Sequence, residues 1–199
     1  MDASTFFLYV WYALVFGVPI YFCNSFANIS KFIPFLGVPV DGGKNWKDGR
    51  RIFGDHKTWR GIIFGIIFGT AAGVVVWYLC FVKWDVFVLA DKYSASFTPS
   101  KSAYPVYPWY IGFFMSIGDH FADLLGSFVK RRMNIKSGAA LPLYDQGSWM
   151  VTGLLFALPF VWGVSHLWFY VVALIIVTPA IHFVTNIAAY FMKLKDVWY

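Results

Sequence analysis

Five apolar stretches divide the chain, and each approaches the length that a helix needs to cross a lipid bilayer. A hydrocarbon core takes about 20 consecutive apolar residues in helical form. Polar and basic segments separate the stretches, so the pattern predicts an all-α integral membrane protein that forms one domain over residues 1–199. The five predicted spans are residues 6–27, 61–82, 104–129, 149–164 and 167–192.

The composition supports this fold class. Hydrophobic residues make up 59% of the chain and charged residues 13%, whereas soluble domains carry about 25% charged residues. The net charge is +6, and all ten acidic residues are aspartates. In a membrane protein, a basic balance reflects cytoplasmic loops and attraction to anionic lipids or phosphorylated substrates. We therefore expect no nucleic-acid partner.

The basic residues also predict the orientation. Thirteen of the sixteen Lys and Arg residues lie in segments 28–60, 130–148 and 193–199, which an odd number of spans places on one side of the membrane. The positive-inside rule puts that side in the cytoplasm. The N-terminus is then outside, the C-terminus is cytoplasmic, and two cytoplasmic loops face the same compartment.

The third span carries a stripe of polar residues. Positions three or four apart share one face of a helix, and an aspartate at mid-membrane costs about 2.5–3.5 kcal/mol on insertion scales. Two aspartates on one face therefore point to function, or to acids that are neutralised by Lys57 or Arg60. The stripe consists of Ser116, Asp119, Asp123, Ser127 and Lys130.

Basic residues follow the acids directly. Lys130, Arg131, Arg132 and Lys136 come at the predicted cytoplasmic end of the span, and their side chains suit phosphate oxygens. Carboxylates are ligands for Mg²⁺, which also takes water and substrate phosphates. Acids beside bases are typical of phosphoryl or nucleotidyl transfer. The alternative is a small cation- or proton-coupled transporter that uses the intramembrane aspartates.

The two predicted cytoplasmic loops add similar chemistry. Lys57, Thr58 and Arg60 open the second span at a helix N-terminus, which favours anions. Asp145 lies just before the fourth span and is either a third oxygen ligand or a helix cap. The second span also carries glycines at positions 61, 65, 69 and 73. They predict a packing seam, a wall against a lipid chain or the contact of a homodimer, and the sequence does not decide among these.

The segment from Asp119 to Gln146 resembles the phosphatidate cytidylyltransferase (CDP-diacylglycerol synthase) superfamily. That signature has a Ser, a Lys-Arg pair three residues on, a later Lys, and a Pro-containing loop that reaches an Asp. It corresponds here to Ser127, Lys130–Arg131, Lys136, Pro142 and Asp145, with Asp123 one turn before the serine.

The first loop, DGGKNWKDGRRIFGDHKTWRG, is similar to the archaeal branch of that superfamily, CDP-archaeol synthase. One feature departs from the bacterial and eukaryotic pattern, which continues Asp-Arg-x-Asp. Asp145 is followed by Gln146, Gly147 and Ser148. The second loop carboxylate of the larger enzymes is therefore missing, and Asp119 is a candidate to replace it.

The resemblance implies a nucleotidyltransferase in phospholipid biosynthesis. It would transfer CMP from CTP to an unsaturated archaeal ether-lipid phosphate, digeranylgeranylglyceryl phosphate, and release pyrophosphate. The site would lie at the cytoplasmic face of the cell membrane, with Mg²⁺ as cofactor. The implied metal ligands are Asp119, Asp123 and Asp145; the implied catalytic residues are Asp123, Lys130 and Arg131; and the implied substrate contacts are Lys57, Thr58, Arg60, Ser127, Lys130, Arg131 and Lys136.

Overall fold

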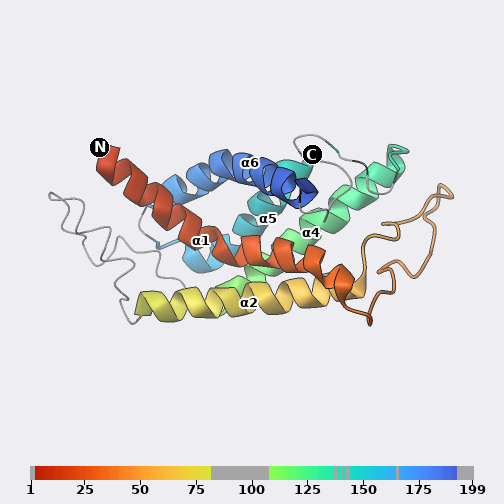
Figure 1. The fold of residues 1–199 in the computed structure, drawn as a ribbon, viewed down its shortest axis with the longest axis horizontal. Coiled ribbons are helices and arrows are strands. Elements are labelled where there is room, and N and C mark those ends of the chain that lie inside the picture. The colour runs from red at the N-terminus through yellow and green to blue at the C-terminus, as the bar shows by residue number, and fades with distance from the viewer. Residues whose placement is uncertain are drawn as a thin grey trace.

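Five long helices make up most of the described part of the protein in a computed structural model. The structure describes residues 3–81, 108–136, 139, 141, 144–164 and 166–191. In these residues the regular structure is helical, apart from two isolated β-bridges in the loop after the first helix. The predicted all-helical class is thus confirmed (Figure 1). The helices are α1 (Ala3–Ile29), α2 (Trp59–Phe81), α4 (Ile111–Arg132), α5 (Tyr144–Val161) and α6 (Leu167–Phe191), with a short 3₁₀ helix η1 (Ser30–Phe32) after α1.

Three of the helices, α1, α2 and α6, are long and apolar enough to cross a bilayer by length and composition. Helix α4 carries the charged stripe, and α5 has 18 residues. Five spans were predicted, and the described residues contain five long helices, while the membrane crossing of α4 and α5 stays a prediction. Residues 104–107 of the third predicted span lie outside the described residues.

Several helix boundaries differ from the predicted spans. The largest difference is at the start of α4, which begins at Ile111 rather than 104, and two further differences extend helices into polar sequence. Helix α5 begins at Tyr144 rather than 149, so Asp145 lies inside its first turn. The backbone N–H of Asp145 donates to the Leu141 carbonyl at 3.1 Å, which starts the helix before its apolar part. Helix α4 continues to Arg132, three residues beyond the predicted 129. In both cases polar residues form helical turns that an apolar window does not detect.

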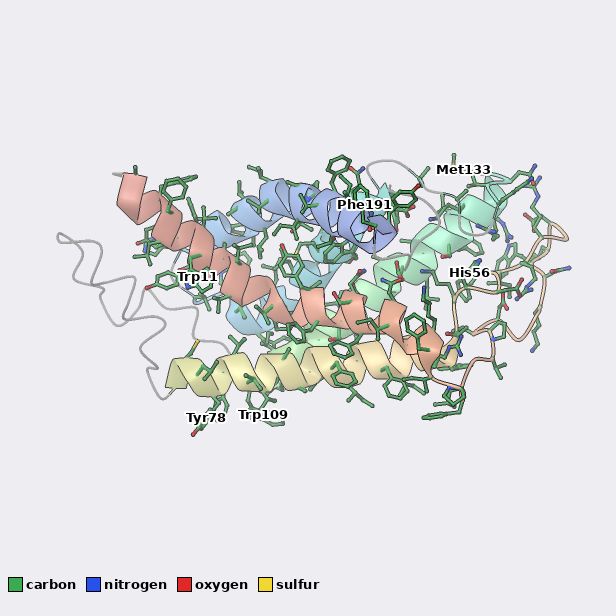
Figure 2. All side chains as sticks on the ribbon, viewed as in Figure 1. Trp11, His56, Tyr78, Trp109, Met133 and Phe191 are labelled. Carbon is green, nitrogen blue, oxygen red and sulfur yellow. The ribbon has the colours of Figure 1, made fainter. Side chains whose placement is uncertain are left out.

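The charged side chains of the described residues lie mainly at one end of the molecule. In Figure 1, α1 and α2 lie side by side, and the C-terminal end of α1 meets the N-terminal end of α2 beside the loop that joins them. Figure 2 shows nitrogen-bearing side chains collected around His56 and Met133, at the end opposite Trp11. The core between the helices is apolar and includes Tyr12, Phe16 and Met150, all fully buried.

The glycine stripe of α2 is a packing seam within the chain. A Cβ at Gly69 would overlap the Ser116 hydroxyl of α4 and lie 2.9 Å from the Pro19 carbonyl oxygen of α1. A Cβ at Gly73 would lie 2.8 Å from the Cα of Gly112. Small residues let helix backbones approach closely in membrane proteins. Of the readings that the sequence left open, the contacts support tight packing of α2 against α1 and α4.

This seam generates a stability prediction. Replacing Gly69 with Ala should lower the midpoint of thermal unfolding in detergent, by the equivalent of about 1–3 kcal/mol, because the added methyl overlaps backbone and side chain from two helices. The matched control is Gly147→Ala in α5, where a Cβ meets nothing within 4 Å. Equal midpoints for the two variants would contradict the seam.

Candidate active site

The loop between η1 and α2 folds around the side chain of Asp41, which is completely buried. Its carboxylate accepts hydrogen bonds from the Arg51 guanidinium at 2.7 Å and from the backbone N–H groups of Gly43, Phe53 and Gly54 at 2.9–3.0 Å. Burial alone would raise the pKa of Asp41, but these donors outweigh it and hold the pKa below the ordinary 3.8. The loop is therefore organised by one ionised carboxylate.

A reciprocal contact of arginines fastens this loop to the C-terminal end of α4. Arg132 donates to the Arg51 carbonyl at 2.6 Å, and Arg50 donates to the Arg132 carbonyl at 2.6 Å. Arg132 also forms an ion pair with Asp48 at 3.0 Å. Residues more than 80 positions apart in the sequence are thus joined at the charged end of the bundle.

Lys57, at the end of this loop, forms an ion pair with Asp123 of α4. The Lys57 ammonium lies 2.7 Å from Asp123 Oδ2. The two side chains are 27% and 38% exposed, so water reaches this pair. The sequence left open that the aspartates of the polar stripe are neutralised by Lys57 or Arg60 rather than functional. The ion pair of Asp123 with Lys57 is present.

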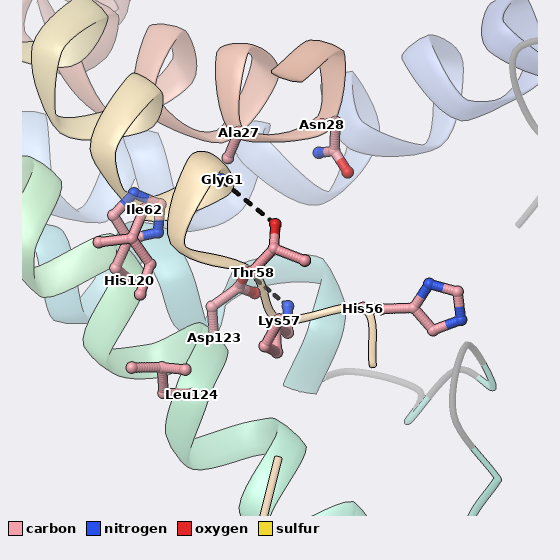
Figure 3. Close-up of a pocket in the computed structure, with 10 residues that line it drawn as sticks. All are labelled: Ala27, Asn28, His56, Lys57, Thr58, Gly61, Ile62, His120, Asp123 and Leu124. Atoms are coloured by element: carbon pink, nitrogen blue, oxygen red, sulfur yellow. Dashed lines mark hydrogen bonds and ion pairs between the residues drawn. The ribbon is translucent and has the colours of Figure 1, made fainter. Parts of the chain in front are cut away.

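The pair lies in an open pocket where three helices converge (Figure 3). Figure 3 shows α1 contributing its last residues, α2 its first turn, and α4 the wall that carries Asp123. A carboxylate and an ammonium that share a pocket open to water are well placed for a charged ligand. The lining consists of Ala27, Asn28, His56, Lys57, Thr58, Gly61, Ile62, His120, Asp123 and Leu124.

A second ion pair joins α4 to the start of α5. Lys130 donates to both carboxylate oxygens of Asp145, at 2.9 and 2.8 Å. Asp145 also accepts from the backbone N–H of Leu141 at 2.7 Å, so it stabilises the turn that enters α5. Lys130 follows Asp123 by two helical turns, roughly 10 Å of rise along α4. The two acid–base pairs therefore succeed each other along one helix.

Asp119 lies elsewhere. Its side chain is 1% exposed and is not part of the pocket lining. Cys23 of α1 donates to Asp119 Oδ2 at 3.2 Å, and His120 lies beside it, with Nδ1 at 3.8 Å. Among the described residues, the potential metal ligands near Asp119 are Cys23 and His120, and neither Asp123 nor Asp145 belongs to that group. Its predicted role as a third magnesium ligand stays a prediction, without support from this geometry.

The remaining predicted substrate contacts differ in whether their side chains already have partners within the protein. Arg60 donates to the Ile33 carbonyl at 2.8 Å, and Thr58 accepts from the Gly61 N–H at 3.4 Å as the N-cap of α2, so both have structural partners. The Nε of Arg131 is buried and has no hydrogen-bond partner. Ser127 is buried and Lys136 is exposed, while Pro142 of the signature lies outside the described residues.

Sequence reasoning missed several residues of this end of the molecule. His56 and Asn28 line the pocket, and Asp41 organises the loop. A signal for His56 was available, because it precedes Lys57 directly. Asn28 comes from the end of the first apolar stretch, and nothing in the pattern pairs it with residues 57 and 123.

Comparisons with known proteins identify the family of this chain. The sequence matches the CarS-like family, described as CDP-archaeol synthase, over residues 6–199. Curated proteins named CDP-archaeol synthase are 37% identical in Pyrococcus furiosus, covering 94% of each chain, and 37% identical in Thermococcus kodakarensis, covering 98% of this chain and 96% of the relative. The chain belongs to the CDP-archaeol synthase family. The transporter hypothesis is therefore set aside.

A solved structure supports the same assignment. It is described as an intramembrane enzyme for archaeal membrane lipids biosynthesis, and it shares 25% identity and a TM-score of 0.59 over 85% of this chain and 92% of that one. As a member of the CDP-archaeol synthase family, the chain is a membrane-embedded nucleotidyltransferase of lipid biosynthesis. It makes a CDP-activated lipid.

The Asp41 loop generates a prediction on this family member. Asp41→Asn should make the loop between η1 and α2 more sensitive to limited proteolysis, because the neutral amide binds Arg51 more weakly and cannot accept all the hydrogen bonds that the buried carboxylate accepts from the loop backbone. The folded-state pKa of Asp41 is lowered. Its contribution is therefore fully present above the ordinary value of 3.8 and is lost only as the pH falls below it.

Wild-type cleavage should consequently be unchanged between pH 5 and pH 8. The matched control is Asp55→Asn, which removes the other partner of Arg51. That side chain is 74% exposed, so its loss should alter cleavage little. Equal cleavage rates for the two variants would show that Asp41 does not organise the loop.

Proposed function

We propose that the protein transfers CMP from CTP to digeranylgeranylglyceryl phosphate and releases pyrophosphate. The observation that carries this proposal is the pair of acid–base contacts, Lys57–Asp123 and Lys130–Asp145, at the charged end of an otherwise apolar bundle. A lipid phosphate arrives from the bilayer and a nucleotide arrives from water. A charged site at the end of the helices lies where the two can meet.

The reaction joins two anions. An oxygen of the lipid phosphate attacks the α-phosphorus of CTP and forms a new P–O–P bond, while the bond from that phosphorus to the β-phosphate oxygen breaks. The electron pair leaves with pyrophosphate. A phosphate monoester is already anionic near neutral pH, so the attack needs no strong general base. Repulsion between the two polyanions is the barrier that the site must lower.

The residues fit a Mg²⁺ cofactor on the chemistry of their donors. Asp123 and Asp145 offer oxygen ligands on partly exposed side chains, 38% and 32% exposed, and Mg²⁺ in nucleotide enzymes often takes only one or two carboxylates besides water and phosphates. Bound there, Mg²⁺ would neutralise charge on the triphosphate. Asp119 points into a different group of residues and is not required for this fit.

Lys57 and Lys130 are also proposed to bind substrate phosphates. In the structure each carboxylate is neutralised by one lysine, Lys57 for Asp123 and Lys130 for Asp145. If Asp123 and Asp145 held Mg²⁺, Lys57 and Lys130 would be free to bind phosphate oxygens. The ion pairs thus compensate the acids and keep the lysines beside the proposed phosphate site.

Arg131 adds a planar donor group to this end of the site. Its Nε is buried without a hydrogen-bond partner, which leaves it available for a phosphate oxygen. Lys136 is exposed beyond the end of α4 and provides a further charge in the path of the nucleotide. Ser127 lies on the same helix, one turn after Asp123. We assign these three residues to substrate phosphates.

The charged end faces the cytoplasm in this proposal. Support comes from the collection of basic residues at that end (Figure 2) and from the positive-inside rule. The protein then resides in the cell membrane, with its N-terminus outside and its site open to cytoplasmic CTP.

The direct test is a transfer assay with purified protein in detergent. Radiolabelled CTP, Mg²⁺ and digeranylgeranylglyceryl phosphate should yield a lipid-linked CMP and pyrophosphate in equal amounts. Phosphatidate and a lipid alcohol without phosphate serve as comparison acceptors, and the alcohol should give no product. Absence of labelled lipid with every lipid phosphate would refute the proposed reaction.

A variant links this activity to the site. Asp123→Asn should reduce transfer at least about 100-fold, since it removes a charge that offsets several kcal/mol of repulsion through the metal, while the protein remains inserted and monodisperse. Asp55→Asn changes an exposed aspartate of the loop between η1 and α2, and it should retain activity. Normal transfer by Asp123→Asn would remove this residue from the mechanism.

A further inference from the structure

A compact group of three metal-ligating side chains lies inside the bundle, apart from the two ion pairs. Cys23 comes from α1, and Asp119 and His120 come from α4. Cys23, Asp119 and His120 are 0%, 1% and 6% exposed. Their potential ligand atoms all lie within 4.8 Å of one another. This is the one such group of three among the described residues.

The carboxylate in this group is incompletely compensated. No Lys or Arg of the described residues forms an ion pair with Asp119, and its Oδ1 is buried without a hydrogen-bond partner. The thiol of Cys23 donates to Oδ2, and the Asn24 side chain lies close enough to stabilise the charge. A buried carboxylate with a bare oxygen is costly unless something else binds it.

The glycine seam makes room for the group. A Cβ at Gly65 would overlap the His120 imidazole, and a Cβ at Gly69 would lie 2.9 Å from the Cβ of Cys23. Helix α2 therefore packs closely against His120 and Cys23 without filling the space that they occupy. His120 also lines the open pocket, so an ion can reach the group from water along that side.

We propose that Cys23, Asp119 and His120 bind a divalent transition-metal ion of the zinc type. Tetrahedral sites have metal–ligand distances of about 2.0–2.3 Å, which place neighbouring ligand atoms about 3.3–3.8 Å apart. The Cys23 sulfur lies 3.2 Å from Asp119 Oδ2 and 3.5 Å from His120 Nε2. Two of the three separations are thus close to the required values, and all three ligand atoms lie within 4.8 Å of one another.

The charges balance as well. Binding releases the thiol proton of Cys23 to solvent, and the resulting thiolate together with the Asp119 carboxylate carries two negative charges. A divalent ion with neutral His120 then gives a site of zero net charge, which suits a low-dielectric interior. Water from the pocket, or the Asn24 side chain beside Asp119, completes the fourth position.

This ion is distinct from the proposed magnesium cofactor. Sulfur and imidazole ligands select zinc, cobalt and related ions, whereas Mg²⁺ takes oxygen ligands and keeps its waters. The bound ion would pin α1 to α4 at the level of the pocket and fix the orientation of His120, which belongs to both. The proposal does not depend on the transferase reaction, because metal binding is measured without substrates.

The test uses Co²⁺ as a spectroscopic probe on the full chain in detergent. Protein is first freed of metal with a chelator and then held in millimolar Mg²⁺, which occupies oxygen sites. Adding Co²⁺ should produce one equivalent of bound ion, the visible bands of tetrahedral cobalt and a near-ultraviolet thiolate-to-cobalt charge-transfer band. Zn²⁺ should abolish all of these bands when it displaces the cobalt.

The second cysteine provides the matched control. Cys80→Ser should keep the full spectrum, and Cys23→Ser should lose the charge-transfer band. Asp123→Asn should also keep it, which separates this site from the catalytic one. Circular dichroism and gel filtration establish that each variant is folded. No thiolate band in the wild type, or a band that survives in Cys23→Ser, would overturn the proposal.

Discussion

Uncompensated negative charge is unfavourable inside a helical bundle of low dielectric constant, and this constraint governs how α4 is arranged. The helix carries Asp119 and Asp123 among apolar neighbours, and Asp145 follows at the start of α5. Asp123 is neutralised by Lys57 and Asp145 by Lys130. Asp119 has a thiol and an imidazole instead. Asp119 therefore has a different environment from Asp123 and Asp145, and this difference separates its proposed role from theirs.

The pairing of Asp123 depends on structure far from it in the sequence. Lys57 reaches the pocket because Asp41 orders the preceding loop and because Arg50 and Arg132 fasten that loop to α4. The close approach of α2 and α4, which the glycine seam permits, brings the start of α2 to the same place. Loop order, helix packing and the ion pair thus form one connected arrangement. A fault in the loop should act on the site through the position of Lys57.

The sequence predicted the helices well and the site in part. Apolar length alone indicates α1, α2 and α6, and the four-residue spacing of polar positions places Asp119 and Asp123 on one face of α4. The first turn of α5 was missed because it is polar, so hydropathy does not mark it. The spacing also suggested a joint role for the two acids. It carried no information on Cys23, which is 96 positions away and draws Asp119 into a separate group.

In the proposed mechanism, Asp123 alternates between Lys57 and a divalent cation. Titration of the purified protein with Mn²⁺, followed by the electron paramagnetic resonance signal of the free ion, tests it most directly. Lys57→Met removes the competing ammonium and should tighten Mn²⁺ binding, whereas Asp123→Asn removes the ligand and should weaken it. If both variants weaken Mn²⁺ binding, or if neither changes it, Lys57 and a metal ion do not share this carboxylate.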